Sequence, residues 1–508
     1  MNHWLILPIL LPAIVAPLLA MAVRHDIVLA RVYSVGSTVL LVLLGLLQVW
    51  MAFDGTTRTY ELGNWAAPFG IVLVLDRLAA IMLLLTAVLG LLVLLYAING
   101  CDRRGRHFHA LFQFQLMGLN GAFLTGDLFN LFVFFEVLLI ASYGLMVHGG
   151  GAARTRAALQ YVIVNLIGSS LFLFALGLIY GVTGTLNMAD LALKVPQVDS
   201  GNQALLYTGA TLLLIVFGLK AAMVPLHFWL PGTYGNAAGP VAALFSIMTK
   251  VGAYGIIRVY ILAFGPQHGE QHWFISEWLM PSAAITLILG MIGVVASRSL
   301  SQQSGFAALA SMGTVMIAVA AFTPQAESAA LYYLIHSTLA IAALFLVVDA
   351  VTIRRPGLGD ALITGPQFTH IGLIGSMFFV SVIAVAGLPP LSGFTGKLLI
   401  LDAVTELQGW GWIWAVILGT SLLALISFAS SGSMIFWKST SVDGNLVAPQ
   451  SPPIALPMVA VGSILAVLFL FTAASPVVDH YLDATAEQLF DTQQYIHAVL
   501  GGEELASS

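Results

Sequence analysis

About fourteen apolar segments, each roughly twenty residues long, follow one another along this chain with only short polar connections between them. About 20 apolar residues is the length that an α-helix needs to cross the hydrocarbon core of a bilayer. The composition agrees, because 59% of the 508 residues are hydrophobic and 8% are charged, whereas soluble domains average about 25% charged residues. We therefore predict an all-α polytopic membrane protein built as one helical bundle.

Two of the predicted spans are interrupted. The seventh contains Pro225 and the twelfth contains Pro389 and Pro390, and each is followed by a short apolar second half, at 226–230 and 391–404. The first segment lacks a basic n-region and a cleavage site, so we expect it to be a span and not a removed signal peptide. The spans are expected at 5–23, 32–52, 78–98, 109–125, 128–147, 157–180, 205–223, 240–263, 280–297, 306–322, 328–350, 370–387, 412–436 and 455–474.

Basic residues are distributed unevenly among the connections between these spans. Eleven lie in odd-numbered connections and three, Arg58, Arg77 and Lys194, in even-numbered ones. Because basic residues are enriched in cytoplasmic loops, we expect odd connections to face the cytoplasm and both termini to face the periplasm or exterior. Cys101 is the one cysteine, and we expect a free structural thiol. The eleven are Arg24, Arg31, Arg103, Arg104, Arg106, Arg154, Arg156, Arg298, Arg354, Arg355 and Lys438.

The other four of the eighteen basic residues, Lys220, Lys250, Arg258 and Lys397, fall inside spans. An ionisable residue at membrane depth is costly, so it is by default a candidate functional residue. A desolvated lysine can lose its proton whereas arginine cannot, so the three lysines suit a site that must change charge. Arg258 lies closer to a span end, and we expect a structural, snorkelling side chain there.

The seventh span reads FGLKAAMVPLHFWLP from Phe217 to Pro231, with Lys220 five residues before Pro225. A proline inside a helix frees backbone carbonyls, which is tolerated in a membrane only where the gap faces protein or a wet cavity. We expect those carbonyls to provide a local partner for the Lys220 ammonium. His227 is a candidate relay group because imidazole titrates near neutral pH, with helix capping or packing as the alternative.

Two further ionisable residues lie near the middle of their spans. Glu136, in the fifth span, is a candidate proton or cation acceptor, with a neutral packing role as the alternative. Lys250, in the eighth span, is a candidate relay group, and Tyr254 lies on the same helix face. Asp127 near the start of the fifth span is equally consistent with helix capping.

The second half of the chain repeats this arrangement. Lys397 follows the break of the twelfth span in GLPPLSGFTGK, as Lys220 accompanies that of the seventh. Interrupted spans in corresponding positions indicate a repeat-built transporter, and their separation by five helices predicts an inverted repeat. His336 lies alone in the eleventh span, where a relay role and a hydrogen-bonded core role are equally consistent with the sequence. We expect Asp349, near the end of that span, to be a loop charge.

Several enzyme classes are excluded by missing motifs. The sequence has no nucleotide-binding loop, no Cys/His metal spacing, no G-x-S-x-G and no dinucleotide fingerprint. We therefore expect a transporter subunit and not an enzyme, with no cofactor and no nucleic-acid partner. The polar tail 476–508 has apolar residues at helical spacing and is expected to form an amphipathic surface helix.

Four segments, FFEVLLIASYGL, FGLKAAMVPLHFWLP, SIMTKVGAYGIIR and GLPPLSGFTGK, occur in an order that resembles one known family. It is the antiporter-like subunit family shared by Mrp/Pha-type monovalent cation/proton antiporters and the proton-pumping subunits of respiratory complex I. The resemblance covers nearly the whole chain. The second half and residues 158–191 are most similar to the D-type subunits of Mrp/Pha antiporters.

This resemblance implies about fourteen transmembrane helices, with helices four to eight and nine to thirteen forming two inverted repeats. The chain would then divide into 1–108, the repeats 109–264 and 265–440, and 441–508 with the last helix and the tail. It also implies that Glu136 and Lys220 form a modulating pair, that Lys250 is the central relay, and that Lys397 ends the proton path. His336 and His227 are additional relay candidates from the residue analysis.

The function implied is proton translocation within a multisubunit Na⁺(K⁺)/H⁺ antiporter of a bacterial plasma membrane, coupled to export of the monovalent cation. The partners would be other Mrp/Pha-type subunits, H⁺, Na⁺ or K⁺, and the lipid bilayer. The alternative is a proton-pumping subunit of a quinone- or hydrogenase-linked oxidoreductase. The sequence does not choose between Na⁺ and K⁺ and shows no all-oxygen cation cage.

Two positions depart from the family pattern. Relatives in complex I usually carry Asp-x-Lys where this chain has Ser299, Leu300 and Ser301, and many relatives carry a lysine where it has Ile341. The path between Lys250 and Lys397 would therefore depend on His336, hydroxyl groups and water.

Overall fold

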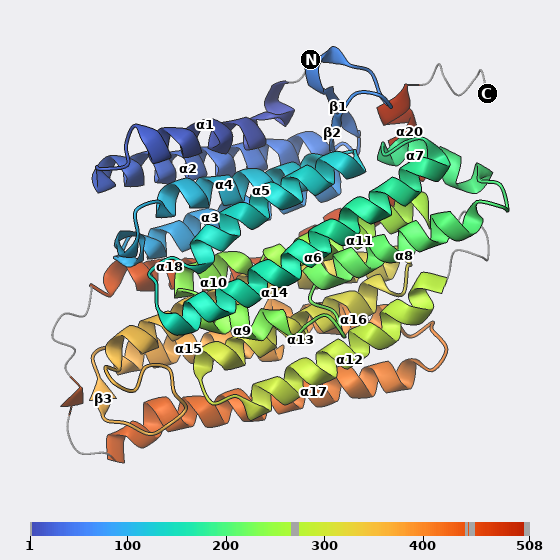
Figure 1. The fold of residues 1–508 in the computed structure, drawn as a ribbon. Helices are drawn as coiled ribbons and strands as arrows, with labels where there is room; N and C mark the ends of the chain where they lie inside the picture. The colour runs from blue at the N-terminus through green and yellow to red at the C-terminus, as the bar shows by residue number, and fades with distance from the viewer. Residues whose placement is uncertain (1–2, 266–273, 442–444, 447–452, 502–508) are drawn as a thin grey trace.

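The computed structural model describes residues 3–265, 274–441, 445–446 and 453–501 as a bundle of helices that run mostly along a common direction (Figure 1). The labelled helices are α1 (Leu7–Met21), α2 (Ile27–Ala52), α3 (Arg77–Ala97), α4 (Phe108–Leu124), α5 (Leu128–Met146), α6 (Ala152–Thr183), α7 (Met188–Lys194), α8 (Gln203–Lys220), α9 (Trp229–Asn236), α10 (Gly239–Phe245), α11 (Met248–Ala263), α12 (Phe274–Ala296), α13 (Leu300–Val319), α14 (Pro324–Arg354), α15 (Ile371–Ala386), α16 (Ser392–Ala403), α17 (Trp410–Gly432), α18 (Ala455–Ala473), α19 (Ser475–Phe490) and α20 (Thr492–Leu500).

Strands and short helical turns connect these helices. β1 (Arg58–Glu61) pairs with β2 (Val72–Leu75) in an antiparallel hairpin, and β3 (Gln367–Phe368) pairs with β4 (Asn445–Leu446) in parallel. The turns are η1 (His3–Leu5), η2 (Leu62–Asn64), η3 (Cys101–Arg104), η4 (Val195–Gln197), η7 (Ser433–Trp437) and η8 (Lys438–Ser441).

Each predicted span coincides with a helix or with a consecutive pair of helices. Within the described residues, ten helical segments are long and apolar enough to cross a membrane, and α1 and α15 are shorter apolar helices. The polytopic all-α fold is therefore confirmed, whereas the total of fourteen crossings, the inverted repeats and the four-part division remain predictions. The division's boundaries at 265 and 440 lie beside residues 266–273 and 442–444, which fall outside the described ranges.

The predicted interruptions of the seventh and twelfth spans are both present. α8 ends at Lys220 and α9 begins at Trp229, while α15 ends at Ala386 and α16 begins at Ser392. A third interruption, between α10 and α11, was not predicted. It falls at residues 246–247, where the Tyr234 hydroxyl donates to the Phe245 carbonyl (2.6 Å). Neither proline nor glycine marks this site in the sequence.

The two most enclosed spans occupy the centre of the bundle. All residues of the strongly hydrophobic 18-residue stretch in α10–α11 are buried, and so are 89% of the residues in the corresponding stretch of α14. These helices carry Lys250 and His336. Lys250 and His336 therefore lie in the part of the bundle that is best shielded from lipid.

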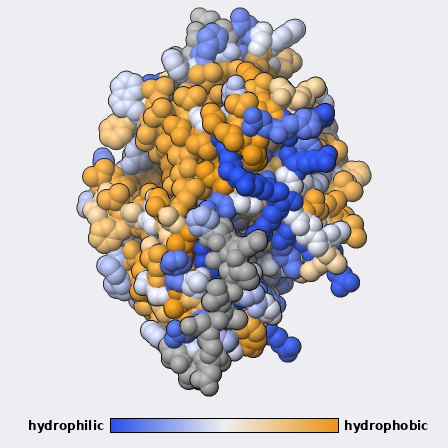
Figure 2. Space-filling view, turned by 90° about the vertical axis from the view of Figure 1, so that its left-hand side faces the viewer, coloured by the Kyte–Doolittle hydropathy of each residue, from blue (hydrophilic) through white to orange (hydrophobic). Residues whose placement is uncertain are grey.

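Described residues from several odd-numbered connections lie together at one end of the bundle. A hollow of about 490 Å³ is lined by residues of five odd connections, including Arg104, Arg154, Asn236, Ser301 and Asp360. The left-hand side of the molecule, onto which Figure 2 looks, carries a band of hydrophilic residues within a largely hydrophobic surface. Which membrane side each end faces remains a prediction.

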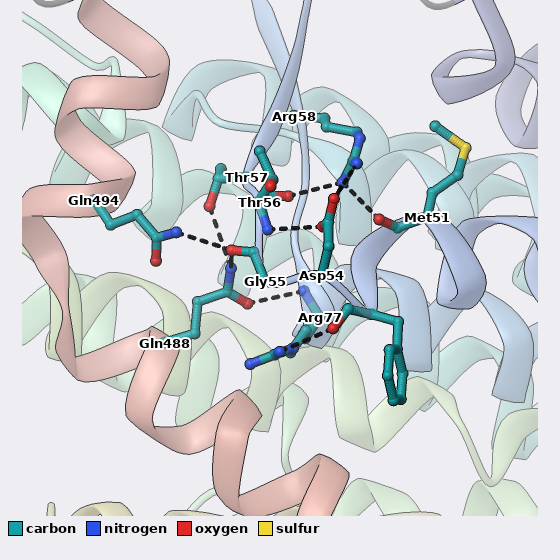
Figure 3. Close-up of polar contacts among 10 residues, drawn as sticks. Met51, Asp54, Gly55, Thr56, Thr57, Arg58, Arg77, Gln488 and Gln494 are labelled. Atoms are coloured by element: carbon teal, nitrogen blue, oxygen red, sulfur yellow. Dashed lines mark hydrogen bonds and ion pairs between the residues drawn. The ribbon is translucent and has the colours of Figure 1, made fainter.

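The C-terminal tail packs against the opposite end as two helices, α19 and α20, so the expected single surface helix is divided. Gln488 and Gln494 each donate to the Gly55 carbonyl (2.8 Å), and Arg77 donates to the Ala484 carbonyl (2.9 Å). Figure 3 shows this contact beside the β1–β2 hairpin. Leu489 is buried against the bundle. Residues 502–508 of the predicted tail lie outside the described residues.

Cys101 is a buried free cysteine, as predicted. Burial raises the pKa of its thiol to about 12. The thiolate is the reactive form of cysteine, so this residue is chemically inert in the folded protein.

Candidate functional site

Lys220 is the last residue of α8, and its ammonium is held by the neighbouring helix α6. The side chain is 8% exposed, and Nζ donates to Asn165 Oδ1 at 3.0 Å. Nζ also lies 5.9 Å from the centre of the Phe135 ring, within cation–π range. The expectation that carbonyls freed by the break would bind Lys220 is wrong. The Leu219 carbonyl accepts instead from the Trp229 indole N–H (3.1 Å).

The direction of the side chain explains this difference. Side chains on a helix tilt toward the N-terminus of that helix. Lys220 stands immediately before the break, so its side chain extends away from the gap and toward α6.

Glu136 lies half-buried on α5 and, like Lys220, contacts α6. Ser169 of α6 donates a hydrogen bond to Glu136 Oε1. Among the ion pairs of the described residues, none joins Glu136 to Lys220. Asn165 and Ser169 are four residues apart on α6, so they lie on one face and hold the amine and the acid separately.

Asp127 has the capping role that the sequence allowed. It precedes α5, and its carboxylate accepts from the Asn130 backbone N–H at 2.8 Å. The helix that carries Glu136 therefore begins at a fixed residue.

Lys250 lies in the first turn of α11, directly after the unpredicted interruption of the eighth span. The residue is 1% exposed, and Nζ has no hydrogen-bonding partner among the described residues. Two residues further on, Gly252 packs against the end of α8, where an added Cβ would lie 2.5 Å from Ala221 N. The absence of a side chain at Gly252 allows α11 to approach the break that follows Lys220.

Lys397 in α16 and His336 in α14 meet at the second break. Lys397 Nζ donates to the Ala386 carbonyl and to Ser421 Oγ, both at 2.8 Å. His336 Nδ1 lies 2.8 Å from Ser392 Oγ, and Nε2 lies 3.1 Å from the Ala384 carbonyl oxygen. The freed carbonyls of this break thus hold both groups.

A small cavity of about 20 Å³ joins these two residues. Its lining includes His336, Lys397, Ser311 and Thr314, and also Ile341, the position at which many relatives carry lysine. A cavity of this volume holds about one water molecule. The lining is mostly apolar, but five of its sixteen residues carry hydroxyl groups that could serve in place of the missing lysine, namely Ser311, Thr314, Tyr333, Ser337 and Thr420.

His227 lies at the first break, apart from Lys220. It lines a hollow of about 460 Å³ together with Asn236, Ser299 and Gln302. The Nδ1 atom is buried and has no hydrogen-bonding partner among the described residues. Because Asn236 and Ser299 belong to odd connections, this hollow opens toward that end of the bundle.

Two structural expectations require correction. Arg258 is buried and does not snorkel, because its guanidinium pairs with Asp76 at 2.5 and 2.8 Å. Asp349 is not a loop charge, since it lies within α14 and accepts from the Tyr96 hydroxyl (3.0 Å). Asp76 also caps α3 by accepting from the Ala79 N–H. Both carboxylates therefore tie helices together.

Sequence reasoning missed Asn165 and Ser169 as partners of the candidate pair. The signal was available, because two polar residues four apart in an apolar helix share one face. In the described residues, no cluster of three or more His, Cys, Asp or Glu could hold a metal ion.

Three comparisons place this chain among known proteins. A family model described as the transmembrane domain of NADH:quinone oxidoreductase/Mrp antiporter matches residues 125–427. The D-type subunit of a probable K⁺/H⁺ antiporter from Rhizobium meliloti (strain 1021) is 39% identical, over 100% of this chain and 99% of that protein. The D-type subunit of the Na⁺/H⁺ antiporter from Bacillus subtilis (strain 168) is 38% identical, over 98% of this chain and 100% of that protein.

A solved structure extends the likeness to three dimensions. The match is a chain of the Mrp complex from Dietzia sp. DQ12-45-1b, with a TM-score of 0.87 and 28% identity. It covers 99% of this chain and 100% of that chain. The similarity therefore includes the N-terminal helices and the C-terminal tail, which lie outside the segment matched by the family model.

Proposed function

Because the chain belongs to the NADH:quinone oxidoreductase/Mrp antiporter transmembrane family, we propose that it is the D-type, proton-translocating subunit of a multisubunit Na⁺/H⁺ or K⁺/H⁺ antiporter. The observation that carries this proposal is full-length identity of 38–39% to proteins named as such subunits. Other subunits of the same assembly are its partners. The relatives include both K⁺/H⁺ and Na⁺/H⁺ antiporters, so the proposal leaves the cation open.

The proposed proton path follows the buried ionisable groups across the two breaks. Lys250 and Lys397 take up and release protons, and His336 with nearby hydroxyls connects them. His227 supplies the link to the hollow at the odd-connection end. The buried position of Lys250 and the small cavity that both His336 and Lys397 line support this order.

Glu136 and Lys220 act as the switch in this scheme. When the two side chains pair, the acid compensates the positive charge of Lys220; when they separate, that charge repels a proton on Lys250. Charges in a low-dielectric interior interact much more strongly than in water. The contacts of Lys220 with Asn165 and of Glu136 with Ser169 correspond to the separated state.

We further propose that the odd connections face the cytoplasm of a bacterial cell and that both termini face the exterior. The concentration of arginine at one end of the bundle supports this orientation. Helices four to eight and nine to thirteen are proposed as the inverted repeats, because each group contains one lysine-bearing break.

The experiment that tests this function is cation-driven proton movement in vesicles that contain the whole assembly. Glu136→Ala and Lys220→Ala should each abolish the pH change that follows addition of Na⁺ or K⁺. Antiport near the wild-type rate in both variants would reject the switch. The subunits that co-purify distinguish this function from the redox-linked alternative, which would bring iron–sulfur or quinone-site subunits.

A further inference from the structure

A second polar hollow lies away from the proposed proton path, at the odd-connection end of α1, α2 and α4. It has a volume of about 210 Å³. The α1–α2 turn supplies Arg24 and His25 to its wall, and the turn before α4 supplies Arg103, Arg106 and His107.

The two acidic residues of this hollow are already engaged. Asp26 caps α2 by accepting from the backbone N–H groups of Val28 (2.9 Å) and Leu29 (3.1 Å). Asp102 is 1% exposed and accepts two hydrogen bonds from Arg31, at 2.6 and 2.9 Å. The charge of Asp102 is thus offset by Arg31, which leaves the single carboxylate of Asp26 against the three arginines Arg24, Arg103 and Arg106 in the wall of the hollow.

The environment of Asp102 keeps it ionised and paired. Burial opposes ionisation, but hydrogen bonds from His109 and Arg31 outweigh it and lower the pKa of Asp102 to about 2. The Arg31–Asp102 pair also joins α2 to the turn before α4, which fixes the two walls of the hollow relative to each other. His109 lines the buried floor, and its Nδ1 has no hydrogen-bonding partner in the described part of the chain.

The rim cations lack acidic partners. Arg24 donates through Nε to His25 Nε2 at 2.8 Å. Within the described residues, no ion pair involves Arg103 or Arg106, both of which are exposed. The hollow therefore presents three guanidinium groups at its rim, an arrangement suited to an anion with several oxygen acceptors.

The surface beside the hollow is apolar. Met21 at the end of α1 is 78% exposed, and Val32 on α2 is 61% exposed. A ligand that fits both surfaces has an anionic head and hydrocarbon tails. We propose that this hollow, defined by Arg24, Arg103 and Arg106, binds the phosphate headgroup of an anionic phospholipid whose acyl chains lie along α1 and α2.

Basic pockets between transmembrane helices at the cytoplasmic side are a known mode of anionic lipid recognition. Each basic residue near such a headgroup contributes roughly fivefold in affinity. Removing Arg103 and Arg106 together should therefore weaken binding about thirtyfold. Both side chains are exposed, so their replacement should leave the fold intact.

The test is native mass spectrometry of the purified antiporter assembly titrated with phosphatidylglycerol, with phosphatidylcholine of the same acyl chains, and with inorganic phosphate. We expect phosphatidylglycerol to bind most tightly, with about thirtyfold loss in R103Q/R106Q. The matched control is R156Q, which removes an exposed arginine at the start of α6 that does not line the hollow.

Four results would overturn the proposal. Unchanged phosphatidylglycerol affinity in R103Q/R106Q would exclude the site, and an equal loss in R156Q would indicate general surface charge. Inorganic phosphate binding as tightly as phosphatidylglycerol would identify a free anion as the ligand. Absence of lipid binding to the intact assembly, with binding to the isolated chain, would show that a partner subunit covers this surface. These outcomes do not depend on antiport activity.

Discussion

The two interrupted helices hold their lysines in different ways. Lys220 stands before its break and reaches Asn165 on a neighbouring helix, whereas Lys397 stands after its break and reaches back to the Ala386 carbonyl. The tilt of helical side chains toward the N-terminus accounts for both directions. A lysine before a break can thus be controlled by side chains of another helix. A lysine after a break is held by the backbone carbonyl dipoles beside that break.

This contrast suggests different functional roles for Lys220 and Lys397. Ser169, which bonds Glu136, lies on the same face of α6 as Asn165, which bonds Lys220. Glu136 can therefore compete with Asn165 for the Lys220 ammonium, which suits a charge that is switched but retained. Lys397 has no acidic residue among its hydrogen-bonding partners. Its backbone acceptor cannot move away, which suits a group that takes up and releases a proton in place.

The largest expected effect comes from replacing Lys397 by arginine, which keeps the charge but does not release a proton. Lys397→Arg should lower antiport about a hundredfold or more, the usual loss when a proton-transfer group is removed. Lys220→Arg should retain a measurable fraction, because the switch needs only the charge. Cation-dependent pH changes in vesicles measure both variants, and equal losses would remove the distinction between the breaks.

Asn165→Ala should have the next largest effect, because it removes the hydrogen-bond acceptor that holds Lys220 away from Glu136. Hydrogen bonds to charged groups contribute about 1.5–3 kcal/mol, so antiport should slow by about ten- to a hundredfold. Ser170→Ala is the matched control, since Ser170 lies on the exposed face of α6 and bonds only to the Leu166 carbonyl. If the control is as slow as Asn165→Ala, the loss comes from general damage to α6.

Glycines that permit close helix approach should matter at both breaks. A Cβ at Gly252 would meet the backbone beyond Lys220, and a Cβ at Gly393 would meet His336 Nε2 at 2.7 Å. Gly252→Ala and Gly393→Ala should each lower the free energy of unfolding by about 1–3 kcal/mol, the range for overpacked sites. Thermal unfolding in detergent measures the change. Gly232→Ala, which has open space around its Cβ within α9, should not lower the midpoint, because alanine favours the helix more than glycine does.

Ser421→Ala should have the smallest effect. Lys397 loses one hydrogen bond but keeps the Ala386 carbonyl. Because that carbonyl remains as an acceptor and a water molecule in the adjacent cavity can replace the lost hydroxyl, antiport should fall by less than in Asn165→Ala, by about two- to tenfold in the vesicle assay. A loss as large as that of Asn165→Ala would mean that side chains, and not backbone dipoles, hold Lys397.

Much of this fold can be predicted from the sequence, because hydropathy and proline positions are properties of individual helices. Segment length located the helices, and the prolines located two breaks. The third break, before Lys250, has no such marker, because α10 ends where the Phe245 carbonyl accepts from Tyr234 and the Ser246 hydroxyl donates to the Thr338 carbonyl. Tertiary packing determines that interruption, and no local propensity reveals it.

The candidate site was predictable to a similar extent. Buried charge identified Glu136 and the three lysines, since such residues are rare at membrane depth. Their partners could not be assigned, because Asn165, Ser169 and Ser421 are ordinary polar residues until the helices are packed. Arg258 was misjudged because its acid, Asp76, lies 182 positions away in sequence. Charge pairs formed by packing leave no local pattern.

The most direct test of the central claim concerns Lys250, which lies between the two breaks and has no hydrogen-bonding partner among the described residues. The measurement is proton flux after a Na⁺ or K⁺ pulse in vesicles with the complete assembly carrying Lys250→Arg, with subunit content checked by co-purification. If Lys250 must release a proton, flux falls to the background of empty vesicles. Flux near the wild-type rate in an intact assembly would contradict a relay through this lysine.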